Sequence, residues 1–281
     1  MTNLDGTPTV VKPSHAFWIL FYGSICLSWL LLFVMSFTHQ VPSLAFIKDF
    51  CVSASDASIF QLTGMWSLMV GAMMLPSFYN FVVVHQDIRR HDLKHTTLLT
   101  SGYVAIWVTV VPLASFTQKY FLDQDLIDLD GRSQSMFLNS LLLLTAGVYQ
   151  FTKIKNACLT VCSSPMHFFL SHWKEGYLGS FRMGLHLGTV CVICCWALML
   201  LAFVGGAMNM IWMAGLTSIM VIEKQGQLSK KFSGLVGMTL IGAGFFPDSS
   251  FTRAVLLPES FRVGCSFGGT LVHSPAEMVA K

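Results

Sequence analysis

Long apolar stretches alternate with short polar connections along most of the chain. Those long enough to cross a bilayer, for which about 20 residues are needed, are expected at residues 16–37, 58–84, 96–116 and 135–151. A further run between His186 and Glu223 contains no ionisable residue except cysteine and is too long for one crossing. Because the pair Gly205-Gly206 interrupts it, the pattern predicts two more spans joined by a tight turn.

A last apolar run, residues 234–246, is rich in glycine and short for a span. It predicts a tilted helix, a re-entrant piece or a seventh span. We therefore expect residues 16–246 to form an all-α polytopic transmembrane helical bundle of six or seven spans. Residues 1–15 are polar and form an N-terminal segment, and residues 247–281 form a C-terminal tail of mixed composition whose side of the membrane depends on the seventh span.

The distribution of positive charge predicts the orientation. With the N-terminus inside, eleven lysines and arginines lie in inner segments and three in outer loops. The inner set is Lys12, Arg89, Arg90, Lys94, Lys153, Lys155, Lys174, Arg182, Lys224, Lys230 and Lys231, and the outer set is Lys48, Lys119 and Arg132. Since inner loops carry the excess of Lys and Arg in membrane proteins, we expect a cytoplasmic N-terminus.

Composition agrees with a membrane protein and excludes several functions. Hydrophobic residues make up 54% of the chain and charged residues only 11%, against about 25% charged in soluble domains. The net charge of +3 is small, and no basic cluster alternates with aromatic residues, so nucleic acid is not an expected partner. The spacings typical of hydrolases and nucleotide-binding enzymes do not occur, so we do not expect an enzyme.

Cysteine supplies the candidate chemistry. Cys191, Cys194 and Cys195 recur at i, i+3 and i+4, which places them on one face of the fifth predicted span. Cys158 and Cys162 are also one helical turn apart, beside lysines expected in the cytoplasm. Cysteine and methionine sulfur are soft ligands that favour copper(I) or zinc. The sequence thus indicates a metal site on the first three cysteines, with Cys158 and Cys162 as a cytoplasmic entry or second site.

A packing role for the same cysteines stays open. Intramembrane cysteine behaves as a small apolar residue, and small residues let helices approach closely. Such a stripe runs along the fifth span as Gly184, Gly188, Cys191 and Cys195. Met65, Met69 and Met73 likewise repeat every four residues on the second span, as either a thioether path or adaptable packing.

Three polar residues fall within or at the end of predicted spans, where an unpaired polar group costs free energy. They are Gln150, Asn209 and Glu223. For Gln150 and Asn209 an interhelical hydrogen bond is the simpler explanation. The same explanation applies to Glu223, although Glu223 also adjoins Lys224 at the predicted cytoplasmic boundary, where a solvated or helix-terminal carboxylate is unremarkable.

Several stretches together resemble a bacterial family of predicted metal-binding integral membrane proteins, a domain of unknown function. They are AMMLP at residues 72–76, YQFTKIKNACLTVCSSP at 149–165, CVICCWALM at 191–199 and GAMNMIW at 206–212, followed by Glu223-Lys224. The resemblance implies a six- or seven-helix fold in the bacterial cytoplasmic (inner) membrane, and metal binding. Where the family commonly has arginine after the second cysteine of its CxxxC pair, this chain has Ser163, so a Cys162 thiolate would have less support.

The sequence thus favours a membrane-embedded metal-handling or accessory protein, with copper as the first candidate metal and zinc as the second. Its expected partners are the lipid bilayer and other membrane protein subunits. The alternative is a non-catalytic structural subunit of a respiratory, photosynthetic or monooxygenase complex, in which the cysteines only pack. A small-solute transporter is a third possibility, but the chain has no convincing internal repeat and little buried charge.

Overall fold

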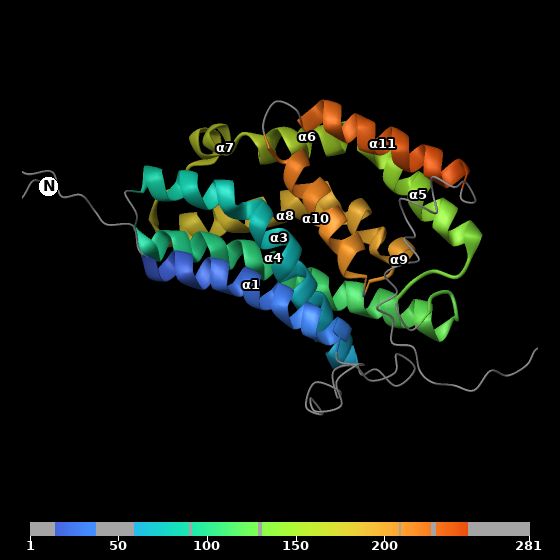
Figure 1. Cartoon of the computed structure of the whole chain (residues 1–281). Helices are drawn as coiled ribbons and strands as arrows, with labels where there is room; N and C mark the ends of the chain where they lie inside the picture. Colours follow the sequence, from blue (N-terminus) through green and yellow to red (C-terminus); the bar gives the residue numbers. More distant parts are fainter. Residues whose placement is uncertain are drawn as a thin grey trace, which may run out of the picture.

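The described parts of the chain form a bundle of helices (Figure 1). The computed structural model describes residues 15–37, 59–89, 92–128, 131–207, 209–225 and 229–246. The helices are α1 (His15–Phe37), α3 (Ile59–Ile88), α4 (Leu93–Asp123), α5 (Met136–Gln150), α6 (Lys153–Ser163), α7 (Pro165–His172), α8 (Gly176–Leu200), α9 (Ala202–Gly205), α10 (Met210–Glu223) and α11 (Ser229–Phe245). The predicted tail, and residues 1–14 of the predicted N-terminal segment, lie outside the described residues.

Four segments are long and apolar enough to cross a membrane: His15–Met35, Ile59–Ile88, Leu93–Asp123 and Gly176–Gly205. The class of helical membrane protein is therefore supported. The remaining apolar helices, α5, α10 and most of α11, are shorter, at 10–17 residues. Six or seven crossings thus stay a prediction, because three of the predicted spans fall on these shorter helices.

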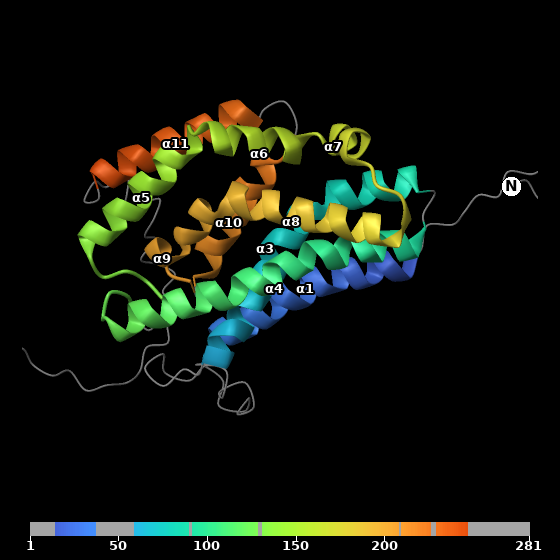
Figure 2. The same ribbon diagram turned by 180° about the vertical axis from the view of Figure 1, so that it is seen from behind.

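Helix α8 lies at the centre of the bundle. In its most apolar stretch 72% of the residues are buried inside the protein, against 22–39% in the other three long segments. Figure 2 shows α4 along one side of α8, whereas α5, α6 and α11 form a separate layer beyond α8 and α10. A side chain on α8 can therefore meet groups from both layers.

Glycines bring α4 and α8 into close contact. A Cβ atom on Gly184 would collide with the carbonyl oxygen of Leu99, and one on Gly188 would lie 2.9 Å from the Cβ of Ile106. On the opposing helix, a Cβ on Gly102 would collide with the carbonyl oxygen of Phe181. The predicted small-residue stripe is confirmed as a helix-packing surface, in line with the role of small residues between membrane helices.

The chain turns sharply between α5 and α6. Phe151 ends α5, and the Thr152 hydroxyl accepts a hydrogen bond from the backbone N–H of Lys155 at 3.2 Å, which caps the new helix. Helix α6 is therefore a separate helix and not a continuation of α5. The new direction of α6 lays its inner face against α8, so that Lys155, Leu159 and Cys162 are buried.

Candidate metal centre

The three cysteines of α8 are all buried, with exposed fractions of 4% for Cys191 and 1% each for Cys194 and Cys195. They do not all face one neighbour. Cys191 and Cys195 contact side chains of α3 and α4, whereas Cys194 packs with α6. The three cysteines therefore contribute to two sulfur groups on different sides of α8: the first contains Cys191 and Cys195, and the second contains Cys194.

The first sulfur group joins α8 to α3. The Sγ of Cys195 lies 3.7 Å from the Sδ of Met74, and the Cys195 thiol donates to the carbonyl oxygen of Cys191 at 2.9 Å. Cys191 lies one helical turn before Cys195 on α8 and is also buried in this part of the core. Tyr103 of α4 places its hydroxyl 3.2 Å from the Sγ of Cys191. Two thiols and a thioether thus converge at one place.

The second sulfur group joins α8 to α6. Cys162 and Cys194 pack together within a small apolar cluster that also contains Leu159 and Val190. Cys158 packs against this cluster and is only partly buried. Because α6 begins as a new helix after α5, Cys162 lies beside Cys194 of α8. The sequence alone does not show that these two cysteines meet.

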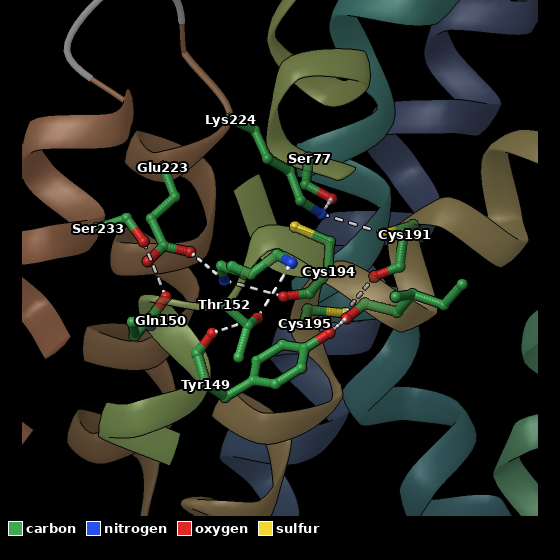
Figure 3. Close-up of polar contacts among 12 residues, drawn as sticks. Ser77, Tyr149, Gln150, Thr152, Cys191, Cys194, Cys195, Glu223, Lys224 and Ser233 are labelled. Carbon is green, nitrogen blue, oxygen red and sulfur yellow. Dashed lines mark hydrogen bonds and ion pairs between the residues drawn. The ribbon is translucent and has the colours of Figure 1, made fainter. Parts of the chain in front are cut away.

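Lys224 reaches the first sulfur group from the end of α10. Its Nζ donates to the Oγ of Ser77 at 2.9 Å and to the Sγ of Cys191 at 3.1 Å, as Figure 3 shows. Its exposed fraction is only 5%. The sequence counts Lys224 among the inner loop charges, whereas its side chain enters the protein between α3 and α8.

Glu223 turns to the opposite side of α10 and is also buried, with an exposed fraction of 1%. Its Oε2 lies 2.8 Å from the Nζ of Lys155, which also donates to the carbonyl oxygen of Cys194 at 2.8 Å. Glu223 is therefore not solvated, and its pairing with Lys155 joins α10 to α6, which is the interhelical contact that the sequence favoured. Lys155 and Lys224 were also counted as loop charges; without them nine of the eleven inner charges remain, so the predicted orientation is unaltered.

The two other intramembrane polar residues have structural partners. The Oε1 of Gln150 accepts a hydrogen bond from the Ser233 hydroxyl of α11 at 2.9 Å, which is the predicted interhelical bond (Figure 3). Asn209 instead caps α10, because its Oδ1 accepts from the backbone N–H of Trp212 at 3.1 Å. The side-chain oxygen of Asn209 therefore caps a helix and does not make the predicted interhelical hydrogen bond.

The chemistry of this centre is that of sulfur. Among the described residues, no group of three or more His, Cys, Asp or Glu side chains is arranged to hold a metal ion. The first sulfur group contains only two such residues, Cys191 and Cys195, because its third sulfur belongs to a methionine. Two thiols and a thioether are nevertheless the soft donors that suit copper(I). The sequence had named neither Met74 nor Tyr103 for this site, although Met74 belongs to the methionine-rich run of α3.

Comparison with known proteins agrees with this chemistry. A family model described as PpoB2, copper chaperone, matches residues 63–246, which is more than half of the chain. The matched region contains both sulfur groups and both buried lysines. No curated protein matches the chain, and no solved structure does.

Proposed function

The chain belongs to the PpoB2 copper chaperone family, and on that premise we propose that it holds copper(I) on buried sulfur within the membrane. Copper is then the cargo of the protein, and the role is non-catalytic. Membership in the family implies that the protein binds copper but does not identify the ligands. The ligands are our proposal: Cys191 and Cys195, with Met74 as a third donor.

The contact between Cys195 and Met74 carries this proposal. Their sulfur atoms lie 3.7 Å apart although 121 residues separate them in the chain. Cys191, one helical turn before Cys195 on α8, contributes the second thiol. A thioether beside two thiolates suits copper(I), whereas structural zinc sites are typically closed by four Cys or His ligands. The donor set thus supports copper, the first of the two metals considered from the sequence.

The second sulfur group gives the cargo a route to the outside of the bundle. Cys162 and Cys194 are buried next to the first group, and Cys158 is partly exposed one turn earlier on α6. Copper(I) would pass along this row by exchange of one thiolate ligand for the next. All five cysteines then take part: Cys158 and Cys162 form the entry, Cys194 links them to the holding site, and Cys191 and Cys195 hold the ion together with Met74.

The surroundings follow from this role. Four apolar segments suited to span a bilayer make the lipid bilayer the first partner. A chaperone also delivers its cargo, so we propose a recipient among other membrane proteins. The bacterial cytoplasmic (inner) membrane, with the N-terminus in the cytoplasm, is the location that the charge distribution and the resemblance favour.

The experiment is a copper(I) titration of the purified protein in competition with a chromophoric copper(I) chelator. The wild type should retain copper, and the variant Cys191→Ser/Cys194→Ser/Cys195→Ser should lose it. Cys26→Ser is the matched control, because Cys26 is an exposed thiol on α1. Equal copper binding by the wild type and the triple variant would contradict the proposal and leave the cysteines as packing residues.

A further inference from the structure

Lys224 is a buried cation whose contacts are a hydroxyl and a thiol. Its Nζ bonds to Ser77 and Cys191, and the ion pairs found among the described residues give it no carboxylate partner. A buried charge without a counter-charge costs several kcal/mol. The arrangement therefore needs a source of negative charge close to the first sulfur group.

Lys155 provides the comparison within the same centre. It is equally buried, but Glu223 neutralises it at 2.8 Å. The second sulfur group, Cys162 and Cys194, accordingly lies beside a lysine whose charge is already matched. The two groups contain the same kind of donor but differ in the charge next to them.

Charge balance then distinguishes the metals that the first group can hold. Two thiols that bind Cu⁺ release two protons to solvent, and the resulting bis-thiolate complex carries one negative charge. The ammonium of Lys224 would balance that charge. A divalent ion such as Zn²⁺ with the same two thiolates is neutral, so Lys224 would remain as an uncompensated buried cation.

We propose that Lys224 is the counter-ion that makes the site formed by Cys191, Cys195 and Met74 selective for a monovalent metal ion. This inference rests on the proposed function and adds the basis of its specificity. The Ser77 hydroxyl orients the ammonium, and the short reach from the end of α10 keeps it beside Cys191. The lysine beside the second sulfur group, Lys155, is already matched by Glu223, which suits a site that passes the ion on.

The test measures the affinities of wild type and variants for copper(I) and for zinc(II) separately. Lys224→Met removes the charge at similar length. It should weaken copper(I) binding and strengthen zinc(II) binding, each by at least about tenfold, since breaking a buried charge pair is costly. Lys224→Arg keeps the charge and should keep the preference. Lys153→Met is the control, because Lys153 is an exposed lysine on α6.

A second variant leaves Lys224 in place and neutralises it. Ser77→Asp puts a carboxylate where the hydroxyl now accepts from Nζ, so it should lose the copper preference as Lys224→Met does. Suppose the wild type binds copper(I) but the ratio of the copper(I) and zinc(II) affinities is unchanged in either variant. This result would overturn the inference about Lys224 and leave the proposed function standing. A wild type that binds no copper(I) would overturn the proposed function itself, and the inference with it.

Discussion

The Nζ of Lys155 on α6 lies 2.8 Å from the Oε2 of Glu223 on α10, and the two side chains are 1% and 2% exposed. This pair ties the second layer of helices to the centre of the bundle. Removing one partner leaves the other as an unpaired buried charge. Lys155→Met should therefore lower the free energy of unfolding by roughly 3–5 kcal/mol, measured by unfolding the protein in detergent.

The double variant Lys155→Met/Glu223→Met separates charge from packing. It removes both charges, and apolar replacements of buried ion pairs are often neutral or stabilising, so it should recover most of the lost stability. Lys153→Met, at an exposed position of the same helix, should change little. If the double variant is destabilised by the sum of the losses measured for Lys155→Met and Glu223→Met alone, the ion pair is not the source of the effect.

The contact of α4 with α8 gives a second prediction. Gly184 faces the backbone of Leu99 so closely that a methyl group would collide with its carbonyl oxygen. Gly184→Ala should force the helices apart and lower stability by about 1–3 kcal/mol. Gly215→Ala is the matched control on α10, because nothing lies within 4 Å of the added methyl group. The same stability for both variants would contradict the close packing.

The apolar pattern was sufficient to predict the helical membrane class and the packing stripe. Hydropathy depends on local composition, and a stripe of Gly and Cys at helical spacing is visible without knowing its partner. The pattern is ambiguous for the shorter helices. Helix α5 and the apolar run after Gly234 fall below the length of a normal span, so sequence length alone cannot decide whether they cross the membrane.

The burial of the two lysines could not be predicted from the sequence, for a different reason. Lys155 and Lys224 stand next to polar connections, which is where solvated lysines are found. Their burial depends on partners far away along the chain, since Glu223 is 68 residues from Lys155 and Ser77 is 147 residues from Lys224. Met74 became a candidate ligand only once α3 was placed against α8.

The thioether of Met74 gives a third prediction. Met74→Leu keeps the volume and the apolar character but removes the sulfur atom that lies 3.7 Å from Cys195. Copper(I) affinity should fall on the order of tenfold, or about 1.4 kcal/mol, with little change in stability. Met69→Leu is the control, since Met69 is equally buried on α3. If the two variants bind copper(I) with equal affinity, Met74 is not a ligand.

Asp92 gives a prediction on pH. It caps α4, with Oδ1 accepting from the backbone N–H of Lys94 at 3.0 Å and Oδ2 lying 2.8 Å from Nδ1 of His95. Partial burial alone would raise its pKa, but the hydrogen bonds from His95 and Lys94 outweigh burial, so the pKa of Asp92 lies below its usual value. The carboxylate therefore stabilises the fold above the unfolded-state pKa, and this contribution is lost as pH falls through the folded-state pKa.

Two variants check this prediction by thermal unfolding at about pH 7 and about pH 3. Asp92→Ala should lose roughly 1 kcal/mol at the higher pH, since the cap is removed. Asp92→Asn keeps an acceptor for the cap and should remove only the pH-dependent part. A pH dependence in Asp92→Asn equal to that of the wild type would assign it to another group.

The most direct test of the copper site is X-ray absorption at the copper K-edge on the copper(I)-loaded protein. If Cys191, Cys195 and Met74 are the ligands, the first coordination shell of copper should contain only sulfur. The number of sulfur atoms should fall in Cys191→Ser and in Met74→Leu but not in Cys26→Ser. A first shell of nitrogen or oxygen, or a sulfur shell that is the same in all these variants, would contradict the proposal that copper is held by Cys191, Cys195 and Met74.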